Sequence, residues 1–361
     1  GIAFLFLWKE ISTKMPLRSW RVLFVLFIVP VLYWMTSASY DWLPDKYISY
    51  LLRYCSICIS ACIVGIYMTY HPCHYELDKL LPFFIIPIGL VLGSLCIDAM
   101  ANMKIIKSDS GLNYQALSYG MAELYAYSCY YVFFSDIGKR TKLLRVVMFV
   151  MIFYFSVLCL VTGGRGAVVY LCFISLFIVW LLLKDSRTNK ALVFMVMALI
   201  LVAFIGVASY IDIWSTAGFA RVAEKISDTS NRIDIYDRAI DVFLDSHGFG
   251  FGLGSIWWTV GIYSHNVFLD LLAEVGIVGC LIVSSVFYLM IKRLLLLVYK
   301  DRSYLFILLC FLKTFVVTIF SSYWIASYQL WFAFGLVFSL KYYKVKKLYG
   351  NKNGYIWNLK K

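Results

Sequence analysis

Charged side chains are scarce in this chain: Asp, Glu, Lys and Arg make up 15% of its 361 residues, whereas 62% are apolar and the mean hydropathy is +0.81. Soluble domains carry about 25% charged and about 45–50% apolar residues. The apolar residues come in blocks of about 18 to 25, the length that one helix needs to cross a bilayer. This shortage of charge excludes a water-soluble enzyme, a secreted protein and a nucleic-acid-binding protein. It predicts an all-α, polytopic integral membrane protein.

The segments expected outside the membrane contain few histidines or cysteines that could bind a metal or form a disulfide. The chain has four histidines and ten cysteines, and no cysteine falls in the one large external connection, where oxidation could make it structural. Cys55, Cys58 and Cys62 resemble a metal spacing. Their offsets mark one face of a helix, however, and a closed zinc site needs a fourth ligand, so packing is the favoured interpretation. No metal site is predicted.

Apolar runs bounded by charge, glycine or proline predict about ten transmembrane helices. The opening stretch Ile2–Trp8 is too short to span, and we expect it to be interfacial or the end of an eleventh span. The expected spans are residues 20–38, 47–70, 80–97, 113–134, 143–161, 166–183, 191–211, 266–291, 303–321 and 323–340. The chain thus divides into spans 1–7 (residues 1–211), a large external loop (212–265), spans 8–10 (266–340) and a basic tail (341–361).

The positions of lysine and arginine predict the orientation. With the N-terminus inside, 23 of the 33 basic residues fall on the inner side and nine on the outer side, as expected for cytoplasmic loops. Both termini are therefore expected in the cytoplasm. Eleven acidic residues leave the outer face near −2, which disfavours a broad polyanion-binding surface. The basic tail is expected to contact anionic membrane lipids rather than nucleic acid.

The external loop has a patterned part. In residues 231–245 apolar side chains recur at helical spacing opposite acidic ones, which predicts a helix lying along the membrane surface. Asn231 is its expected N-cap, and His247 with Gly248 its expected end. Arg232 falls at the helix start, where the dipole disfavours a cation unless an anion lies nearby. Four alternating glycines in 248–254 lack the strand that a nucleotide fingerprint needs, and indicate a flexible or closely packed connection.

Two outward-facing helix starts carry candidate chemistry. His265 opens the eighth span, where the helix dipole favours the neutral imidazole that can accept a proton. The turn Thr162–Gly166 combines glycines with Arg165 at the start of the sixth span, and each of these features favours a phosphate. The structural alternatives are a histidine that caps a helix or contacts headgroups, and an arginine that reaches the interface beside a tight turn.

Ionisable residues inside the expected spans are few. Glu123, Glu274 and Lys313 lie near mid-depth, and Asp270 lies closer to the surface. Charged residues in a membrane are costly and are usually paired or functional. We expect Lys313 to pair with Glu274 or with Glu123, in a structural rather than a catalytic role.

Several of these motifs together resemble one family. His265-Asn266, nine residues, Gly276, two residues and Gly279 is similar to the His-Asn-x9-Gly-x2-Gly pattern of the bacterial O-antigen polymerase and O-antigen ligase superfamily. The turn Thr162–Gly166 resembles the external turn of that family, which ends in arginine. The segment from Asn231 to the alternating glycines is similar to its large periplasmic loop. The resemblance covers mainly residues 160–340.

The resemblance implies a membrane glycosyltransferase of the C-type architecture in the bacterial inner membrane, with a periplasmic active site. Its donor and acceptor would be glycans linked to undecaprenyl diphosphate. On the matching positions, His265 would activate the acceptor hydroxyl, and Arg165 and Arg232 would hold the diphosphate. No cofactor is implied, and the outer segments hold no Asp-x-Asp pair for a metal. Further candidates for substrate binding are Arg238, Asn266, Gly163 and Gly164.

Polymerase is the expected activity among the alternatives. A ligase must approach the phosphorylated core of lipopolysaccharide and should present a basic outer face, whereas this outer face is near −2. Ligase remains the alternative, because it uses the same donor. A transporter of lipid-linked glycans is less favoured, because the chain shows no clear internal repeat and few buried charges. A chain-length regulator protein is a candidate partner.

Overall fold

The computed structural model describes residues 54–68, 73–101, 114–135, 141–162, 164–184, 230–320, 322–324 and 327–339, together with 24, 28 and 52. In these ranges every regular element is a helix, which confirms the all-α prediction for this part of the chain. The expected span 191–211, most of the span 20–38, residues 212–229 of the external loop and the tail 341–361 lie outside the described residues.

Most of the expected spans coincide with a helix. The elements are η1 (Tyr54–Cys58), α4 (Ile59–Met68), α5 (Cys73–Ala101), α6 (Tyr114–Phe133), α8 (Lys142–Thr162), α9 (Arg165–Lys184), α12 (Ser230–Asp245), α13 (Ser255–Thr259), α14 (Val267–Lys300), η4 (Arg302–Tyr304), α15 (Leu305–Phe320) and α16 (Tyr328–Ser339). Four stretches are long and apolar enough to cross a membrane: Lys142–Leu160, Gly166–Lys184, Val267–Lys300 and Arg302–Phe320. The protein is thus an integral membrane protein, and the total of about ten spans stays a prediction.

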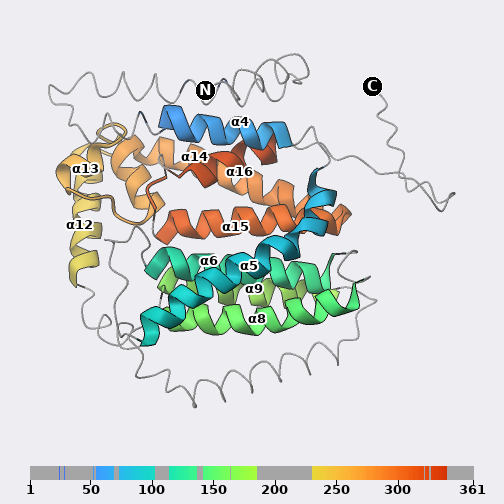
Figure 1. Ribbon diagram of the computed structural model, residues 1–361. Helices are drawn as coiled ribbons and strands as arrows, with labels where there is room; N and C mark the ends of the chain where they lie inside the picture. The colour runs from blue at the N-terminus through green and yellow to red at the C-terminus, as the bar shows by residue number, and fades with distance from the viewer. Residues whose placement is uncertain are drawn as a thin grey trace, which may run out of the picture.

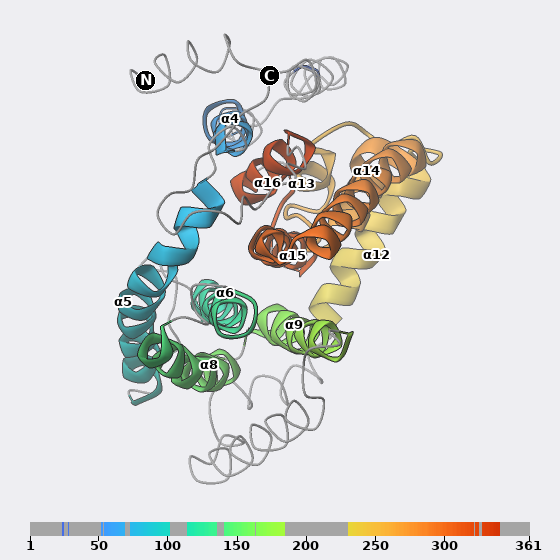
Figure 2. The ribbon, with the colours of Figure 1, turned by 90° about the vertical axis from the view of Figure 1, so that its right-hand side faces the viewer.

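The long helices run side by side, and α12 crosses one end of this bundle together with α13 (Figure 1). Seen along the bundle, α5, α6, α8 and α9 form one group, and α4, α14 and α16 form another (Figure 2). Helix α15 joins them, because it packs against α6 and α9 as well as α14 and α16. The C-terminal helices therefore connect the two halves of the molecule.

Glycines allow some of these helices to approach closely. At Gly65 of α4 an added Cβ would lie 2.2 Å from the Phe332 carbonyl oxygen of α16, and at Gly335 of α16 it would lie 2.2 Å from that of Cys62. Small residues at such crossings are typical of membrane helices, which associate through close backbone packing. Cys62 is thus a packing residue at a helix crossing, as the sequence favoured.

The bundle surface carries large apolar side chains. Phe83 of α5, Leu143 of α8, Leu176 of α9 and Val278 of α14 are 70%, 81%, 68% and 62% exposed. Apolar surface of this extent would promote aggregation in water, whereas hydrocarbon solvates it. The exposed face of the bundle is therefore suited to lipid.

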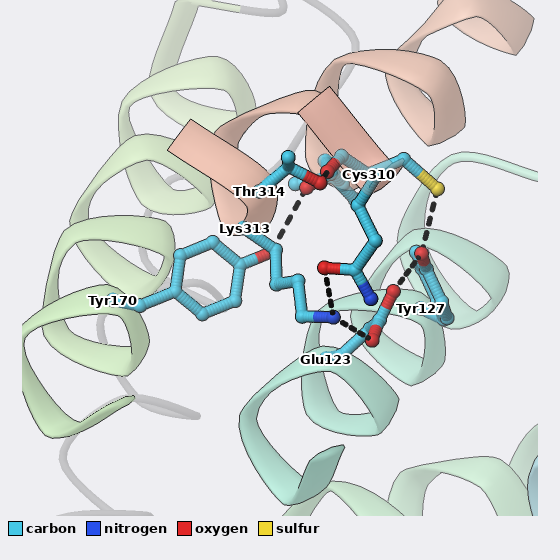
Figure 3. A network of polar contacts seen from close by, with 8 residues as sticks. Glu123, Tyr127, Tyr170, Cys310, Lys313 and Thr314 are labelled. Carbon is cyan, nitrogen blue, oxygen red and sulfur yellow. Dashed lines mark hydrogen bonds and ion pairs between the residues drawn. The ribbon is translucent and has the colours of Figure 1, made fainter. Parts of the chain in front are cut away.

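A polar network ties the helices together at mid-bundle (Figure 3). Lys313 of α15 forms an ion pair with Glu123 of α6 at 2.9 Å and donates to the Gln329 side-chain oxygen of α16 at 3.3 Å. The Tyr127 hydroxyl donates to the same glutamate at 2.6 Å. Glu123 is thereby confirmed as one of the two expected partners of Lys313. The network joins three helices through charged and polar groups that would be costly to leave unpaired.

We predict that Lys313→Met lowers thermal stability, because it leaves the Glu123 carboxylate without its cation. Removing one partner of a buried pair typically costs ~3–5 kcal/mol, and the cost here should be smaller because 26% of the Glu123 side chain is exposed. Thermal unfolding of the purified protein in detergent measures the effect. The double variant Lys313→Met/Glu123→Gln should recover part of the loss. Equal melting temperatures for Lys313→Met and for the surface control Lys142→Met would contradict the prediction.

Candidate functional site

Helix α14 is broken near its start. Gly276 has φ 66° and ψ −170°, values that lie outside the helical region and that only glycine adopts readily. The break separates a short first segment, Val267–Val275, from a long second segment, Ile277–Lys300, and the first is the expected outer one. At the break, backbone N–H and carbonyl groups on both sides lose their regular helical partners. Inside a membrane protein these groups need other hydrogen-bond partners.

The glycine-rich loop supplies those partners. The N–H groups of Phe251 and Gly252 donate to the carbonyl oxygens of Ala273 and Glu274 at 3.0 and 2.8 Å. In the other direction, the N–H of Ile277 donates to the Gly248 carbonyl at 3.0 Å. The loop is thus closely packed against the break, which decides between the two interpretations that its sequence left open.

The glycines are required by this packing. A Cβ at Gly276 would lie 2.3 Å from the Gly248 carbonyl oxygen, and a Cβ at Gly250 would lie 2.5 Å from the Gly276 nitrogen. Backbone atoms at such distances cannot yield without moving the loop. Gly250 also has a positive φ of 79°. The alternating glycines and the Gly276 of the family-like motif therefore belong to one structural feature.

Glu274 fixes the segments around the break. Its carboxylate accepts hydrogen bonds from the Gly254 N–H at 3.0 Å, the Tyr323 hydroxyl at 2.5 Å and the Trp324 indole nitrogen at 3.2 Å. The side chain is almost fully buried. Glu274 thus joins the glycine-rich loop to the segment that follows α15. The alternative pairing of Glu274 with Lys313 was wrong.

The start of α14 holds His265 between two anchored residues. The Ser264 N–H donates to the Asp270 carboxylate at 2.8 Å, and the Asn266 side-chain oxygen accepts from the Phe268 N–H at 3.0 Å as an N-cap. Between them, the His265 backbone has φ 58°, in the left-handed region. This conformation costs of the order of 1–3 kcal/mol for a non-glycine residue and is frequent at functional sites. His265 itself is half-buried.

Asn266 has a structural role in this arrangement. Its amide oxygen is engaged in the helix cap, so a substrate contact from this side chain would have to come from the amide nitrogen. This role explains why histidine and asparagine are adjacent in the motif. The Asn266 cap fixes the helix start, and the helix start positions the His265 imidazole.

The turn before α9 packs at the same end of the bundle. The Gly164 carbonyl accepts from the N–H groups of Ala167 and Val168 at 2.9 and 3.0 Å. A Cβ at Gly164 would lie 2.6 Å from the Ser118 side chain of α6, and a Cβ at Gly166 would lie 3.2 Å from the Phe320 Cβ. Phe320 ends α15, three residues before the Tyr323 that binds Glu274. The α9 start and the α14 break are therefore linked through the end of α15.

The side chains of two predicted cations are not placed. Arg165 begins α9, and Arg232 lies in the first turn of α12, but their side chains lie outside what the structure describes, as does the whole of Gly163. Arg238 is exposed on α12. The structure thus places the backbone of Arg165 and Arg232 at helix starts, as the sequence predicted.

Residues 230–245 form the predicted helix, α12, with one correction. It begins at Ser230, so Asn231 lies inside its first turn and the expected N-cap at Asn231 was wrong. Its end is as expected: the Gly248 N–H donates to the Phe243 carbonyl at 3.1 Å, and His247 has φ 52°, as in a Schellman motif. Ala239 is buried on this helix, which packs against α14.

Sequence reasoning missed the residues that hold the site together. Tyr323 and Trp324 were assigned to a span, whereas they are non-helical and bind Glu274. Asp270 was considered only as a buried charge, whereas its carboxylate anchors Ser264. A Tyr-Trp pair at an expected helix end was the available signal, because both side chains carry a donor on an apolar body.

The comparison with protein families agrees with this geometry. Residues 147–284 match the family model described as O-antigen ligase. The matched region contains the turn before α9, helix α12, the glycine-rich loop, His265 with Asn266, and the break at Gly276. A search of curated proteins finds no match.

The match supports the resemblance drawn from the motifs: residues 147–284 are similar to the O-antigen ligase family. The match supports a function of the O-antigen ligase and polymerase type. The matched residues make up less than half of the chain. Which acceptor the enzyme uses, and which side chains perform the reaction, belong to the proposal below.

We predict that Gly276→Ala lowers both stability and glycan synthesis, because the new Cβ would meet the Gly248 carbonyl oxygen and displace the docked loop. Gly261→Ala is the matched control: Gly261 also has a positive φ, 81°, but an added Cβ there would meet no atom within 4 Å beyond its chain neighbours. Thermal unfolding in detergent and glycan length in cells measure the two effects. An equal loss in both variants would show that backbone conformation, and not loop docking, is what matters.

Proposed function

We propose that the protein polymerises oligosaccharide repeat units linked to undecaprenyl diphosphate, at the outer face of the bacterial inner membrane. The observation that carries the proposal is His265. It lies in the family-matched region, is half-buried, and is held in a left-handed conformation at the start of a broken helix. A proton-accepting group in a fixed position beside a helix start is what acceptor activation requires.

The reaction is a direct displacement. The acceptor hydroxyl oxygen attacks the anomeric carbon of the donor sugar, and its proton passes to the His265 imidazole. The bond between that carbon and the diphosphate oxygen breaks, and undecaprenyl diphosphate leaves with the bonding electrons. Because attack and departure occur on opposite sides, the anomeric configuration inverts.

The leaving diphosphate gathers negative charge, and the proposal assigns its stabilisation to Arg165 and Arg232. Each lies in the first turn of a helix, α9 or α12, so the guanidinium acts beside unpaired helix N–H groups. Preorganised donors of this kind stabilise charge that develops in a transition state. Arg238, Asn266 and the backbone of Gly163 and Gly164 are further candidates for substrate contacts.

The packing at one end of the bundle supports this convergence. The α9 start lies against Phe320, and the chain that continues from Phe320 meets Glu274 within the outer segment of α14. Helix α12 packs against α14 from the same end (Figure 1). The proximity of these three segments, which are far apart in the sequence, supports the proposed convergence on His265.

Polymerase is favoured over ligase by the charge of the outer face. The near −2 balance of the expected outer segments suits an uncharged lipid-linked glycan better than a phosphorylated lipopolysaccharide core. Ligase is the second candidate, because the matched family model bears that description.

A transporter is disfavoured by the partners found at the break. Broken helices are typical of transporters, where the freed groups bind substrate or ions. Here the freed groups of α14 are bound by the backbone of the glycine-rich loop.

The activity is tested by incubating purified protein with lipid-linked single repeat units alone, and then with a lipid A-core acceptor added. The proposal predicts a ladder of lengthening glycans in the first incubation. A product that forms only when lipid A-core is present would establish a ligase. Movement of labelled substrate across liposome membranes without any increase in glycan length would establish a transporter.

We predict that His265→Ala abolishes the ladder, with a loss of at least about 10²-fold in rate, because general-base catalysis typically contributes 10²–10⁴-fold. His247→Ala is the matched control, since His247 is also an external histidine with a positive φ.

Arg232→Ala should likewise abolish long chains while single repeats still appear. Normal chain lengths in His265→Ala and Arg232→Ala cells, at normal protein levels, would refute the mechanism.

A further inference from the structure

Three aromatic rings pack on one another, and one of them, Tyr263, lies against the His265 imidazole. The Tyr263 ring centroid lies 4.2 Å from that of His265, with the planes inclined at 55°. Trp257 lies 5.3 Å and Tyr323 lies 6.0 Å from Tyr263, and the Trp257 and Tyr323 rings meet edge to face at 6.2 Å. We refer to Trp257, Tyr263 and Tyr323 as the aromatic platform.

The platform has a fixed base. Tyr323 is 3% exposed, and its hydroxyl donates to the buried Glu274 carboxylate. The same carboxylate accepts from Gly254, the residue before α13, which carries Trp257. Tyr263 directly precedes Ser264, whose N–H is bound to Asp270. Each ring is therefore positioned by a hydrogen bond to a buried carboxylate. The Tyr323 hydroxyl makes this bond directly, and for Trp257 and Tyr263 a backbone N–H nearby in the chain makes it.

The platform also has an accessible edge. Tyr263 and His265 are half-buried, in contrast to Tyr323. The two side chains lie next to each other, so a molecule that reaches one of them is close to the other. The ring centroids of Tyr263 and His265 are 4.2 Å apart. A group stacked on Tyr263 would therefore lie close to the imidazole.

Interfacial aromatic residues of membrane proteins often serve as lipid anchors. Phe249 illustrates that arrangement, because it is 80% exposed in the nearby loop. The platform differs, since its rings come from three separate segments and pack on one another, with Tyr263 against the imidazole. Lipid anchoring requires no such clustering, so it accounts for Phe249 better than for Tyr263.

We propose that the aromatic platform is the binding subsite for the acceptor sugar. A pyranose ring has an apolar face of C–H groups and a polar rim of hydroxyls. The apolar face can stack on an aromatic ring while a hydroxyl on the rim faces a base. Aromatic surface combined with a few fixed polar groups is typical of small-molecule sites.

The platform suits the acceptor rather than the donor diphosphate. It is built of uncharged rings, whereas a diphosphate needs cations or helix N–H groups. The ring nearest the proposed base should hold the sugar whose hydroxyl that base deprotonates. This assignment to the acceptor rests on the proposed function, whereas sugar binding by the platform can be tested without it.

The experiment measures sugar binding and turnover separately. The probe is the free oligosaccharide released from lipid-linked single repeat units by mild acid, which carries neither lipid nor phosphate. Saturation-transfer NMR with the full-length protein in nanodiscs measures its binding. We expect Tyr263→Leu to weaken binding about tenfold and Tyr263→Phe to remain within about twofold, because the ring supplies the stacking surface. Phe249→Leu is the control variant and should bind as the unaltered protein does.

In the ladder assay, Tyr263→Leu should raise KM for the lipid-linked repeat unit while kcat changes little. If Tyr263→Leu does not accumulate as a monodisperse protein, Trp257→Leu takes its place with the same expectation. Unchanged binding and unchanged KM in the folded variant would overturn the platform and leave the polymerase proposal standing. Binding that depends on Tyr263, in a protein that forms no ladder, would support the platform and contradict the polymerase proposal.

Discussion

The structure of the bundle end that holds His265 depends on the backbone hydrogen bonds between the glycine-rich loop and the break in α14. A helix in a membrane cannot leave its carbonyl and N–H groups without partners, because no water is available to bind them. Phe251, Gly252 and Gly248 supply the partners that the break at Gly276 requires. A Cβ at Gly250 or at Gly276 would meet backbone atoms of the opposite segment, so glycine at these two positions allows the close approach. A helix break and a loop are thereby combined into one rigid unit.

The position of His265 follows from that unit. The break makes Val267–Val275 a short separate helix, and its start is fixed by the Asn266 cap and by the bond from Ser264 to Asp270. Glu274, within the same short helix, fastens the glycine-rich loop and the segment after α15. His265 therefore starts a segment that hydrogen bonds hold in place on both sides, as the proposed role of a preorganised base requires.

Much of the fold could be predicted from hydropathy, and less of the site. Apolar blocks located most of the described helices, because the hydrocarbon core sets a minimum length and composition. The end of α12 was predicted because glycine readily adopts the left-handed conformation in which many helices end, and Gly248 has φ 83°. Hydropathy could not locate the break in α14, since Gly276 lies inside the expected span 266–291, which was predicted as one continuous helix. Nor could it choose between Glu123 and Glu274 as the partner of Lys313, because the pairing depends on which spans are neighbours.

The central claim is that His265 and the two arginines surround one lipid diphosphate at the outer end of the bundle. A cryo-electron microscopy structure with a bound undecaprenyl-diphosphate-linked repeat unit tests it most directly. The account predicts phosphate oxygens within about 3 Å of the Arg165 and Arg232 guanidiniums, with the His265 imidazole facing the anomeric carbon across the space for an acceptor hydroxyl. A diphosphate bound away from both guanidiniums, or an imidazole turned away from the sugar, would contradict it.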